Sequence, residues 1–160
     1  FKIPTTGLRF FTVYGPWGRP DMSLFKFTKN ILENKKIDIF NRGNHVRDFT
    51  YIDDVIKMVS KLIFKKPKIH KKITTKKSDA PFRVINIGND KPVGLLKFIQ
   101  ILENTLGKKA KKNFLSLQKG DVIKTQCDTT ELKKLIKIKP TSLEKGTENF
   151  VKWYKDYYKI

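Results

Sequence analysis

The stretch LRFFTVYGPWGRPDM, residues 8–22, places an arginine shortly after a strand-like run and a tight turn. Its first half is rich in aromatic and β-branched residues, and its second half carries the glycines and prolines that mark turns. The guanidinium of Arg19 is a planar fork of donors that suits a planar anion such as a carboxylate. Because the GPWG turn can hold this side chain rigidly just beyond the strand, the stretch is a candidate anion-binding site.

Other chemistries find little support in the sequence. His45 and His70 lie far apart, in segments interpreted as loops, and no second cysteine accompanies them, so no metal site is expected. No serine stands in a Gly-x-Ser-x-Gly motif. Asp53 and Asp54 open a predicted helix, where the helix dipole explains them without catalysis. The single cysteine, Cys127, cannot form an internal disulfide and is interpreted as a small core or surface residue.

Length and composition indicate one globular domain. The 160 residues are 39% hydrophobic, which is enough for a core. No run approaches the roughly 18 consecutive apolar residues of a membrane helix, and nothing resembles a signal peptide. We therefore expect a cytoplasmic protein with no membrane partner.

The formal net charge of +20 by itself suggests a nucleic-acid or anionic-membrane surface. The make-up of this charge argues against nucleic acid, since 30 of the 35 basic residues are lysines spread along the chain. Readers of bases and phosphates favour arginine forks among exposed aromatic residues. The densest run, residues 65–77, contains no aromatic residue and is interpreted as a solvated loop, with nucleic-acid contact as the alternative.

Apolar residues alternate between strand and helix patterns along the chain, which indicates an α/β fold. Residues 6–13 and 82–89 have the character of strands buried in a parallel sheet, and residues 37–40 form a shorter strand. Residues 48–64 pass from strand to helix near Asp53. Because two buried strands do not make a doubly wound sheet, the rest of the sheet is expected in sequence before the first residue.

Helices are predicted where apolar residues recur at helical spacing. One helix follows Asp21, its expected N-cap, and another covers residues 95–106 and stops at Gly107. The remaining elements are a turn at residues 42–44, a weaker strand at 113–117, and helices near 130–136 and 142–158.

The chain resembles the C-terminal half of extended short-chain dehydrogenase/reductases that act on nucleotide sugars, with the closest likeness to UDP-glucuronate 4-epimerases. The resemblance covers essentially all residues and rests on LRFFTVYGPWGRPDM, GNHVRDFTYIDDV, FRVINIG, KGDVIKTQCDT and FVKWYKDYY, in that order. It implies the C-terminal part of a Rossmann-type α/β fold with a smaller substrate-binding domain. Residues 1–18 would end the NAD-binding sheet and cross out of it. Residues 19–160 would form mainly the substrate-binding domain, with 48–64 and 82–89 returning to the NAD-binding domain.

In this family a tyrosinate takes the proton of a sugar hydroxyl while hydride passes to NAD, and the keto sugar turns before the hydride returns. The glycine-rich phosphate loop and the catalytic Tyr-x-x-x-Lys pair would lie before Phe1. No lysine stands four places after Tyr14 or Tyr51 to replace that pair. This chain alone is therefore expected to hold substrate but not to turn it over.

The resemblance implies the UDP-sugar-binding portion of an NAD-dependent enzyme that interconverts UDP-glucuronate and UDP-galacturonate for surface-polysaccharide synthesis. NAD would be bound mainly by the preceding N-terminal half, and the full-length enzyme would be a homodimer with a UDP-sugar substrate and no nucleic-acid partner. The alternative within the same scaffold is a nucleotide-sugar decarboxylase or dehydratase.

The resemblance also implies substrate-binding roles for particular residues. Arg47 would meet the nucleotide pyrophosphate, and Arg19 would meet the carboxylate of the sugar. The hydroxyl of Thr12 would bond the same carboxylate. Phe40 would lie beside the uracil, and Asp121 would accept hydrogen bonds from the ribose hydroxyls.

One further residue, Phe11, would line the nicotinamide end of the NAD site. Each of these positions also has a structural interpretation, and for Arg47 it is a surface ion pair with Asp48 or Asp53. Gln118 departs from the family pattern, because many relatives carry an arginine for the phosphates at this position.

Overall fold

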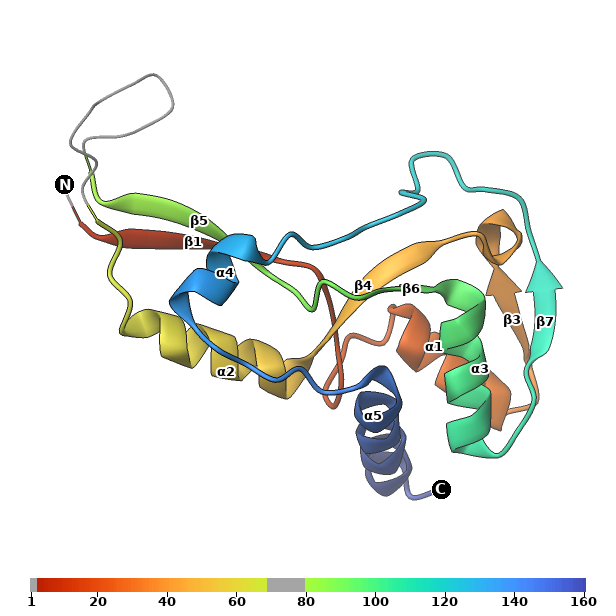
Figure 1. Cartoon of the computed structure of the whole chain (residues 1–160). Coiled ribbons are helices and arrows are strands. Elements are labelled where there is room, and N and C mark those ends of the chain that lie inside the picture. Colours follow the sequence, from red (N-terminus) through yellow and green to blue (C-terminus); the bar gives the residue numbers. More distant parts are fainter. Residues whose placement is uncertain (1–2, 69–79) are drawn as a thin grey trace.

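The structure, a computed structural model, describes residues 3–68 and 80–160 (Figure 1). His70 and most of the lysine-rich run lie outside the described residues. In chain order the elements are β1 (Thr5–Phe10), β2 (Thr12–Tyr14), α1 (Ser23–Leu32), β3 (Lys36–Ile39), the 3-10 helix η1 (Phe40–Gly43), β4 (Val46–Tyr51), α2 (Ile52–Ile63), β5 (Phe82–Ile87), β6 (Pro92–Gly94), α3 (Leu95–Leu106), β7 (Lys111–Phe114), α4 (Thr130–Leu135) and α5 (Leu143–Tyr158). The alternation of strands and helices confirms the predicted α/β class.

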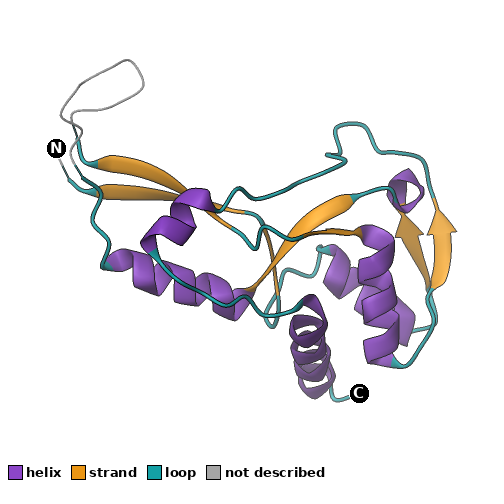
Figure 2. Cartoon of the chain, in the orientation of Figure 1, coloured by secondary structure: helices purple, strands orange, loops and turns teal. Residues whose placement is uncertain are grey.

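The strands form three small sheets that follow one another along an elongated molecule (Figure 2). β1 pairs in parallel with β5 at one end, and β3 pairs in parallel with β7 at the other. Between them β4 lies at the centre of a three-stranded sheet, parallel to β2 and antiparallel to β6. β4 therefore connects the two ends of the molecule.

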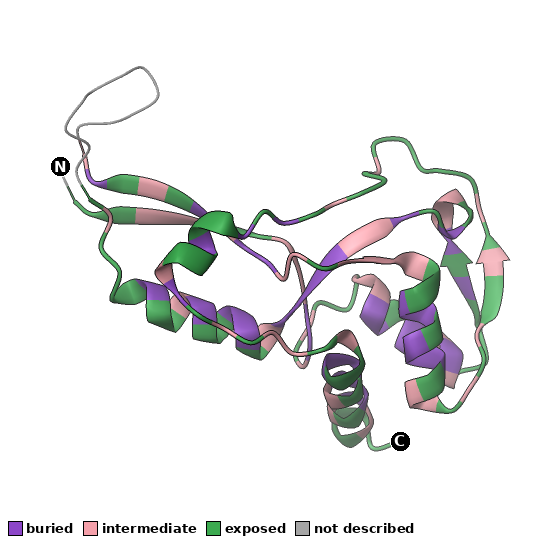
Figure 3. Cartoon of the chain, in the orientation of Figure 1, coloured by how far each residue is buried: buried purple, intermediate pink, exposed green. Residues whose placement is uncertain are grey.

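The prediction of a single buried strand over residues 6–13 is wrong in two respects. The chain changes partner at Phe11, because β1 pairs with β5 whereas β2 pairs with β4. β1 is also partly accessible, as Figure 3 shows, and Phe10 is 53% exposed. The physical reason is that β1 has a strand neighbour on one side only among the described residues.

β4 is the most buried strand of the described chain, since Asp48 to Tyr51 are all buried. The expectation that only residues 6–13 and 82–89 would have the character of buried strands is therefore wrong. β4 has strand neighbours on both sides, which accounts for its burial.

Two hydrophobic clusters lie beneath these sheets. The larger cluster joins α1, α3 and α5 to β3 and β4, and Phe98, Phe150 and Ile37 are almost fully buried in it. The smaller cluster packs α2 and α4 against β5. Within the described residues, no helix is long and apolar enough to cross a membrane.

Two helix ends agree with the sequence analysis and one does not. α3 ends at Gly107 with φ +66°, and the Ser142 hydroxyl at the start of α5 accepts a hydrogen bond from the Lys145 N–H at 3.2 Å. Asp21 is not the N-cap of α1, because Met22 occupies that position without a side-chain bond. The carboxylate of Asp21 is instead engaged by Arg19.

The fully buried carboxylate of Asp48 ties three segments of the chain together. Its Oδ2 accepts hydrogen bonds from the backbone N–H groups of Asp90 and Cys127, both at 2.9 Å. Its Oδ1 accepts from the backbone N–H of Asn89 at 3.2 Å. The carboxylate thus joins β4 to the loop after β5 and to the segment before α4.

We expect Asp48→Asn to destabilise the fold by about 2–4 kcal/mol, because the amide keeps one acceptor and turns an N–H₂ group toward a buried donor. Asp53→Asn is the matched control, since the exposed Asp53 is expected to tolerate the same change. Urea unfolding of the three proteins measures the difference. Equal midpoints for Asp48→Asn and the control would contradict this role.

Candidate functional site

A cavity of about 470 Å³ lies between α1, β3, η1 and the start of β4. It is closed on another side by the segment that contains Gln118 and Asp121. Of the predicted site residues, Phe40, Arg47 and Asp121 all line this cavity. The fold thus brings Asp121 to Phe40 and Arg47 although 74 residues separate it from Arg47.

Arg47 is held rigidly at the edge of the cavity. Its Nη1 donates to the carbonyl oxygens of Val46 at 3.1 Å and Ile123 at 3.2 Å. Its Nη2 donates to Oδ1 of Asp121 at 3.0 Å. The alternative prediction from the sequence, an ion pair of Arg47 with Asp48 or Asp53, is wrong, because Arg47 pairs with the carboxylate of Asp121.

Asp121 is positioned by a backbone segment that runs beside β4. The N–H of Val46 donates to the Ile123 carbonyl at 2.9 Å, and the N–H of Thr125 donates to the Val46 carbonyl at 3.1 Å. The N–H of Asp121 itself donates to the Gln118 carbonyl at 3.2 Å in a turn. These bonds fix the carboxylate opposite Arg47.

His45 also lines the cavity, a position that was not predicted from the sequence. The residue is 5% exposed, and its Nε2 lies 3.2 Å from Oδ2 of Asp121. The two atoms are within ion-pair distance, but Nε2 has no aligned hydrogen-bond partner among the described residues. Alternate residues of an extended segment point the same way. The spacing of two between His45 and Arg47 could therefore have indicated from the sequence that both side chains face the same cavity.

The opposite wall of the cavity is one face of α1. Ser23, Lys26, Phe27 and Asn30 line the cavity, at spacings that put them on the same side of a helix. Phe40 begins η1, and the residues that follow it turn sharply away with positive φ angles. The ring of Phe40 is thereby left half-buried at the cavity wall.

Thr12 and Arg19 line a separate, narrow hollow of about 30 Å³. Ser23 and Phe49 belong to the walls of both this hollow and the larger cavity, so the two adjoin. The Arg19 side chain is 74% exposed, and its Nε donates to Oδ1 of Asp21 at 3.0 Å. This hydrogen bond holds the pKa of the Asp21 carboxyl below its usual value.

The turn before Arg19 is anchored to the rest of the molecule. Gly15 has φ +140°, and a Cβ there would lie 2.6 Å from Cγ2 of Ile52, so the turn requires glycine. The ring of Trp17 lies 5.3 Å from those of Trp153 and Tyr157 in α5. These contacts support the expectation that the turn presents Arg19 from a fixed position.

Phe11 lies where the parallel strands β1 and β5 end together. Its N–H donates to the Ile87 carbonyl at 3.1 Å, and its side chain is half-buried. Gly88 follows β5, and a Cβ there would come within 2.4 Å of Cys127. The carboxyl ends of parallel strands are a common place for ligands in α/β proteins.

Cys127 is a core residue rather than a surface residue, being fully buried. Burial, together with the nearby carboxylate of Asp48, raises the pKa of its thiol to about 12. A neutral buried thiol is a poor nucleophile and a poor metal ligand. In the described part of the chain, no group of three or more His, Cys, Asp or Glu side chains could hold a metal ion.

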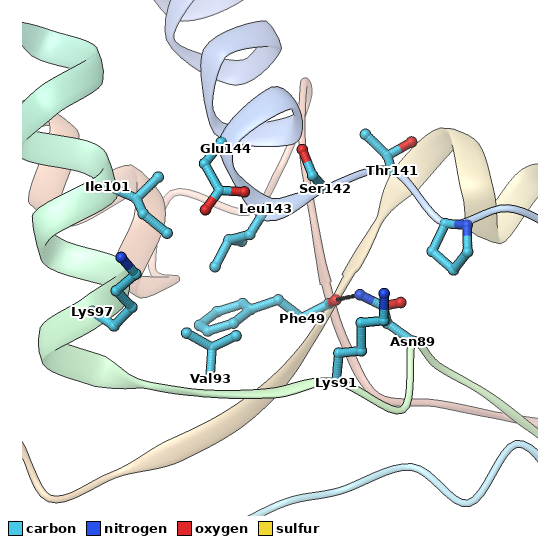
Figure 4. A pocket seen from close by; sticks show the side chains of 11 residues that line it. Phe49, Asn89, Lys91, Val93, Lys97, Ile101, Thr141, Ser142, Leu143 and Glu144 are labelled. Carbon is cyan, nitrogen blue, oxygen red and sulfur yellow. Dashed lines mark hydrogen bonds between the residues drawn. The ribbon is translucent and has the colours of Figure 1, made fainter.

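Phe49 also lines another hollow, of about 310 Å³, which Figure 4 shows from close by. Its walls include Phe49, Val93 and Leu143, with Lys91 and Lys97 among the polar residues. None of the predicted site residues lines it. Substitutions in this hollow can therefore serve as controls for substitutions in the cavity around Arg47.

Comparisons with known proteins identify the family of this chain. Residues 1–88 match the model of the NAD dependent epimerase/dehydratase family. The chain is 49% identical to Protein CapI of Staphylococcus aureus and 43% identical to a probable UDP-glucuronate 4-epimerase of Rhizobium meliloti (strain 1021), in each case over 99% of this chain and 49% of the relative. It thus spans about half the length of these curated relatives.

Among solved structures, the UDP-glucuronic acid 4-epimerase of Bacillus cereus in complex with UDP-glucuronic acid and NAD matches 99% of this chain. The match covers 47% of that protein, with a TM-score of 0.83 and 39% identity. The resemblance to nucleotide-sugar epimerases is confirmed by these matches. The chain therefore belongs to the NAD-dependent epimerase/dehydratase family.

Proposed function

We propose that this chain is the UDP-sugar-binding portion of an NAD-dependent UDP-glucuronate 4-epimerase. The observation that carries the proposal is the single cavity shared by Phe40, Arg47 and Asp121. An aromatic ring, a guanidinium and a carboxylate are the groups that suit a base, a pyrophosphate and a ribose. The names of the matched relatives in Rhizobium meliloti and Bacillus cereus support the choice of sugar nucleotide.

Arg47 is suited to a pyrophosphate because most of its donors are already ordered. Two carbonyl oxygens and one carboxylate oxygen fix the plane of its guanidinium. A preorganised side chain loses little conformational entropy when a ligand binds. The Nε donor, which none of these bonds uses, is then available to a phosphate oxygen, while the Asp121 carboxylate accepts from the ribose hydroxyls.

The sugar would extend from this cavity toward the hollow of Thr12 and Arg19, since the two share the walls at Ser23 and Phe49. A uronate carboxylate there would replace Asp21 as the partner of Arg19. Because the Arg19–Asp21 pair is exposed, it is expected to be weak and easily exchanged.

NAD, when bound, accepts and returns a hydride. The residues of this chain that fit its nicotinamide end are at the joint ends of β1 and β5, where Phe11 is half-buried beside Gly88. We assign most NAD contacts to sequence that precedes this chain, and we assign residues 19–160 mainly to the substrate-binding domain. Since no Tyr-x-x-x-Lys pair occurs around Tyr14 or Tyr51, this chain binds and orients the substrate rather than moving its proton.

We expect Arg47→Gln to weaken the binding of UDP-glucuronate by about tenfold or more, since a hydrogen bond to a charged group contributes about 1.5–3 kcal/mol. Lys91→Gln removes the same charge from the hollow of Figure 4 and is the matched control. Isothermal titration calorimetry of the chain with UDP-glucuronate measures both. An unchanged affinity in Arg47→Gln would remove this residue from the site.

We expect Arg19→Gln to reduce the preference for UDP-glucuronate over UDP-glucose by about tenfold, because a guanidinium grips a carboxylate through two parallel bonds that a hydroxymethyl cannot make. Binding of UDP alone should hardly change. Arg42→Gln is the control, as Arg42 is exposed and lines neither the cavity nor the hollow. If the ratio of the two affinities is the same in all three proteins, Arg19 is only a turn residue.

A further inference from the structure

The cavity around Arg47 has an unfavourable charge balance for an anionic ligand. Two cationic side chains line it, those of Lys26 and Arg47. They are outnumbered by carboxylates from Asp21, Asp38 and Asp121. A pyrophosphate brings further negative charge into this cavity, so another positive charge is needed beside it.

Arg47 alone cannot supply that charge, because its guanidinium is already paired with Oδ1 of Asp121 at 3.0 Å. The other carboxylate oxygen, Oδ2, lies 3.2 Å from Nε2 of His45. Asp121 is therefore placed between a permanent cation and a side chain that can become one, since imidazole changes its charge within the range of about pH 5 to 8.

We propose that His45 is a positioning residue that becomes protonated when a UDP-sugar binds. The imidazolium then neutralises the carboxylate of Asp121, so that the charge of Arg47 acts on the pyrophosphate. This inference rests on the proposed function, because it concerns the same cavity and the same ligand.

The geometry supports this role in two ways. His45 is almost fully buried, and the hydrogen bond from the Leu95 N–H to its carbonyl, at 2.8 Å, fixes its backbone. Its Nε2 is a buried polar atom without an aligned partner among the described residues, although a carboxylate oxygen lies within reach. An imidazolium carries a proton on both ring nitrogens, so a protonated His45 has a charge-assisted donor within reach of this oxygen.

The charges around His45 indicate which group takes up a proton when the ligand binds. The ligand adds negative charge, which favours the imidazolium, and the proton comes from solvent to a ring nitrogen of His45. The other charged side chains that line the cavity are Asp21 and Lys26 near α1 and Asp38 on β3, together with Arg47 and Asp121. None of these acids or bases ordinarily titrates near neutral pH, so His45 is the group expected to take up the proton.

Calorimetry of the unmodified chain with UDP-glucuronate, in two buffers of different ionisation enthalpy near neutral pH, counts the protons taken up on binding. We expect uptake of a substantial fraction of one proton. The affinity should also be about tenfold tighter at about pH 5.5 than at about pH 8. UDP-glucuronate is a suitable probe because its own charges do not change over this range.

His45→Gln should bind without proton uptake and with little dependence on pH, because glutamine keeps a neutral donor but cannot be protonated. Lys26→Gln is the matched control: it removes a charge from the same cavity and should weaken binding while leaving proton uptake in place. A merely structural role for His45 would instead lower the affinity equally at all pH values.

The proposal is overturned if the unmodified chain binds UDP-glucuronate without taking up a proton, or if His45→Gln binds it with unchanged uptake. The first of these measurements needs no variant and so does not depend on the folding of His45→Gln. If the unmodified chain, shown by circular dichroism to be folded, binds no UDP-glucuronate, the proposed function itself fails and this inference fails with it.

Discussion

The buried carboxylate of Asp48 is the constraint on which the arrangement of this chain depends. Its hydrogen bonds to the N–H groups of Asn89, Asp90 and Cys127 hold two distant segments against β4. On the same strand, Arg47 points into the cavity, as the alternation of a β-strand requires. One strand therefore serves as a structural anchor on one side and as a wall of the cavity on the other.

The segment that Asp48 anchors at Cys127 is the one that carries Asp121. From Ile123 to Thr125 this segment is bonded to the backbone of Val46, which places the carboxylate of Asp121 opposite Arg47. An error in the anchoring of this segment would separate the two charged groups. The stability of the fold and the geometry of the site are therefore coupled through β4.

Both candidate arginines are already paired with carboxylates, and the pairs differ in their surroundings. Arg19 and Asp21 are exposed, so solvent screens their attraction and a ligand can exchange with Asp21 at little cost. Arg47 and Asp121 are mostly shielded from solvent, and their charges are accordingly harder to separate. In the function that we propose, the inner pair accordingly orders the ligand, and the outer pair discriminates between ligands.

Local patterns in the sequence predicted local features well. Gly107 and Ser142 mark helix ends because capping depends on neighbouring residues alone. Asp21 follows the same rule but fails as a cap, because Arg19 lies close enough to compete for its carboxylate. The break at Phe11 could not be predicted, since it depends on which distant strands pair with β1 and β2.

In the site, too, features that depend on neighbouring residues could be predicted from the sequence, whereas contacts between distant residues could not. The resemblance to a family selected six residues. The structure places Phe40, Arg47 and Asp121 in one cavity. It places Thr12 and Arg19 in the separate hollow, and Phe11 lines neither. The pairing of Arg47 with Asp121 spans 74 residues and leaves no local signal in the sequence. For His45 the sequence did contain a local signal, its spacing of two from Arg47. That spacing alone does not indicate a role, which follows only from the short distance between His45 and Asp121 in the structure.

The most direct test of this account is a crystal structure of the chain with UDP-glucuronate. The account predicts that the ligand occupies the cavity of about 470 Å³ between α1 and the start of β4, with its pyrophosphate against Arg47 and its uracil beside Phe40. A ligand bound instead in the hollow of Figure 4, next to Lys97 and Leu143, would contradict it.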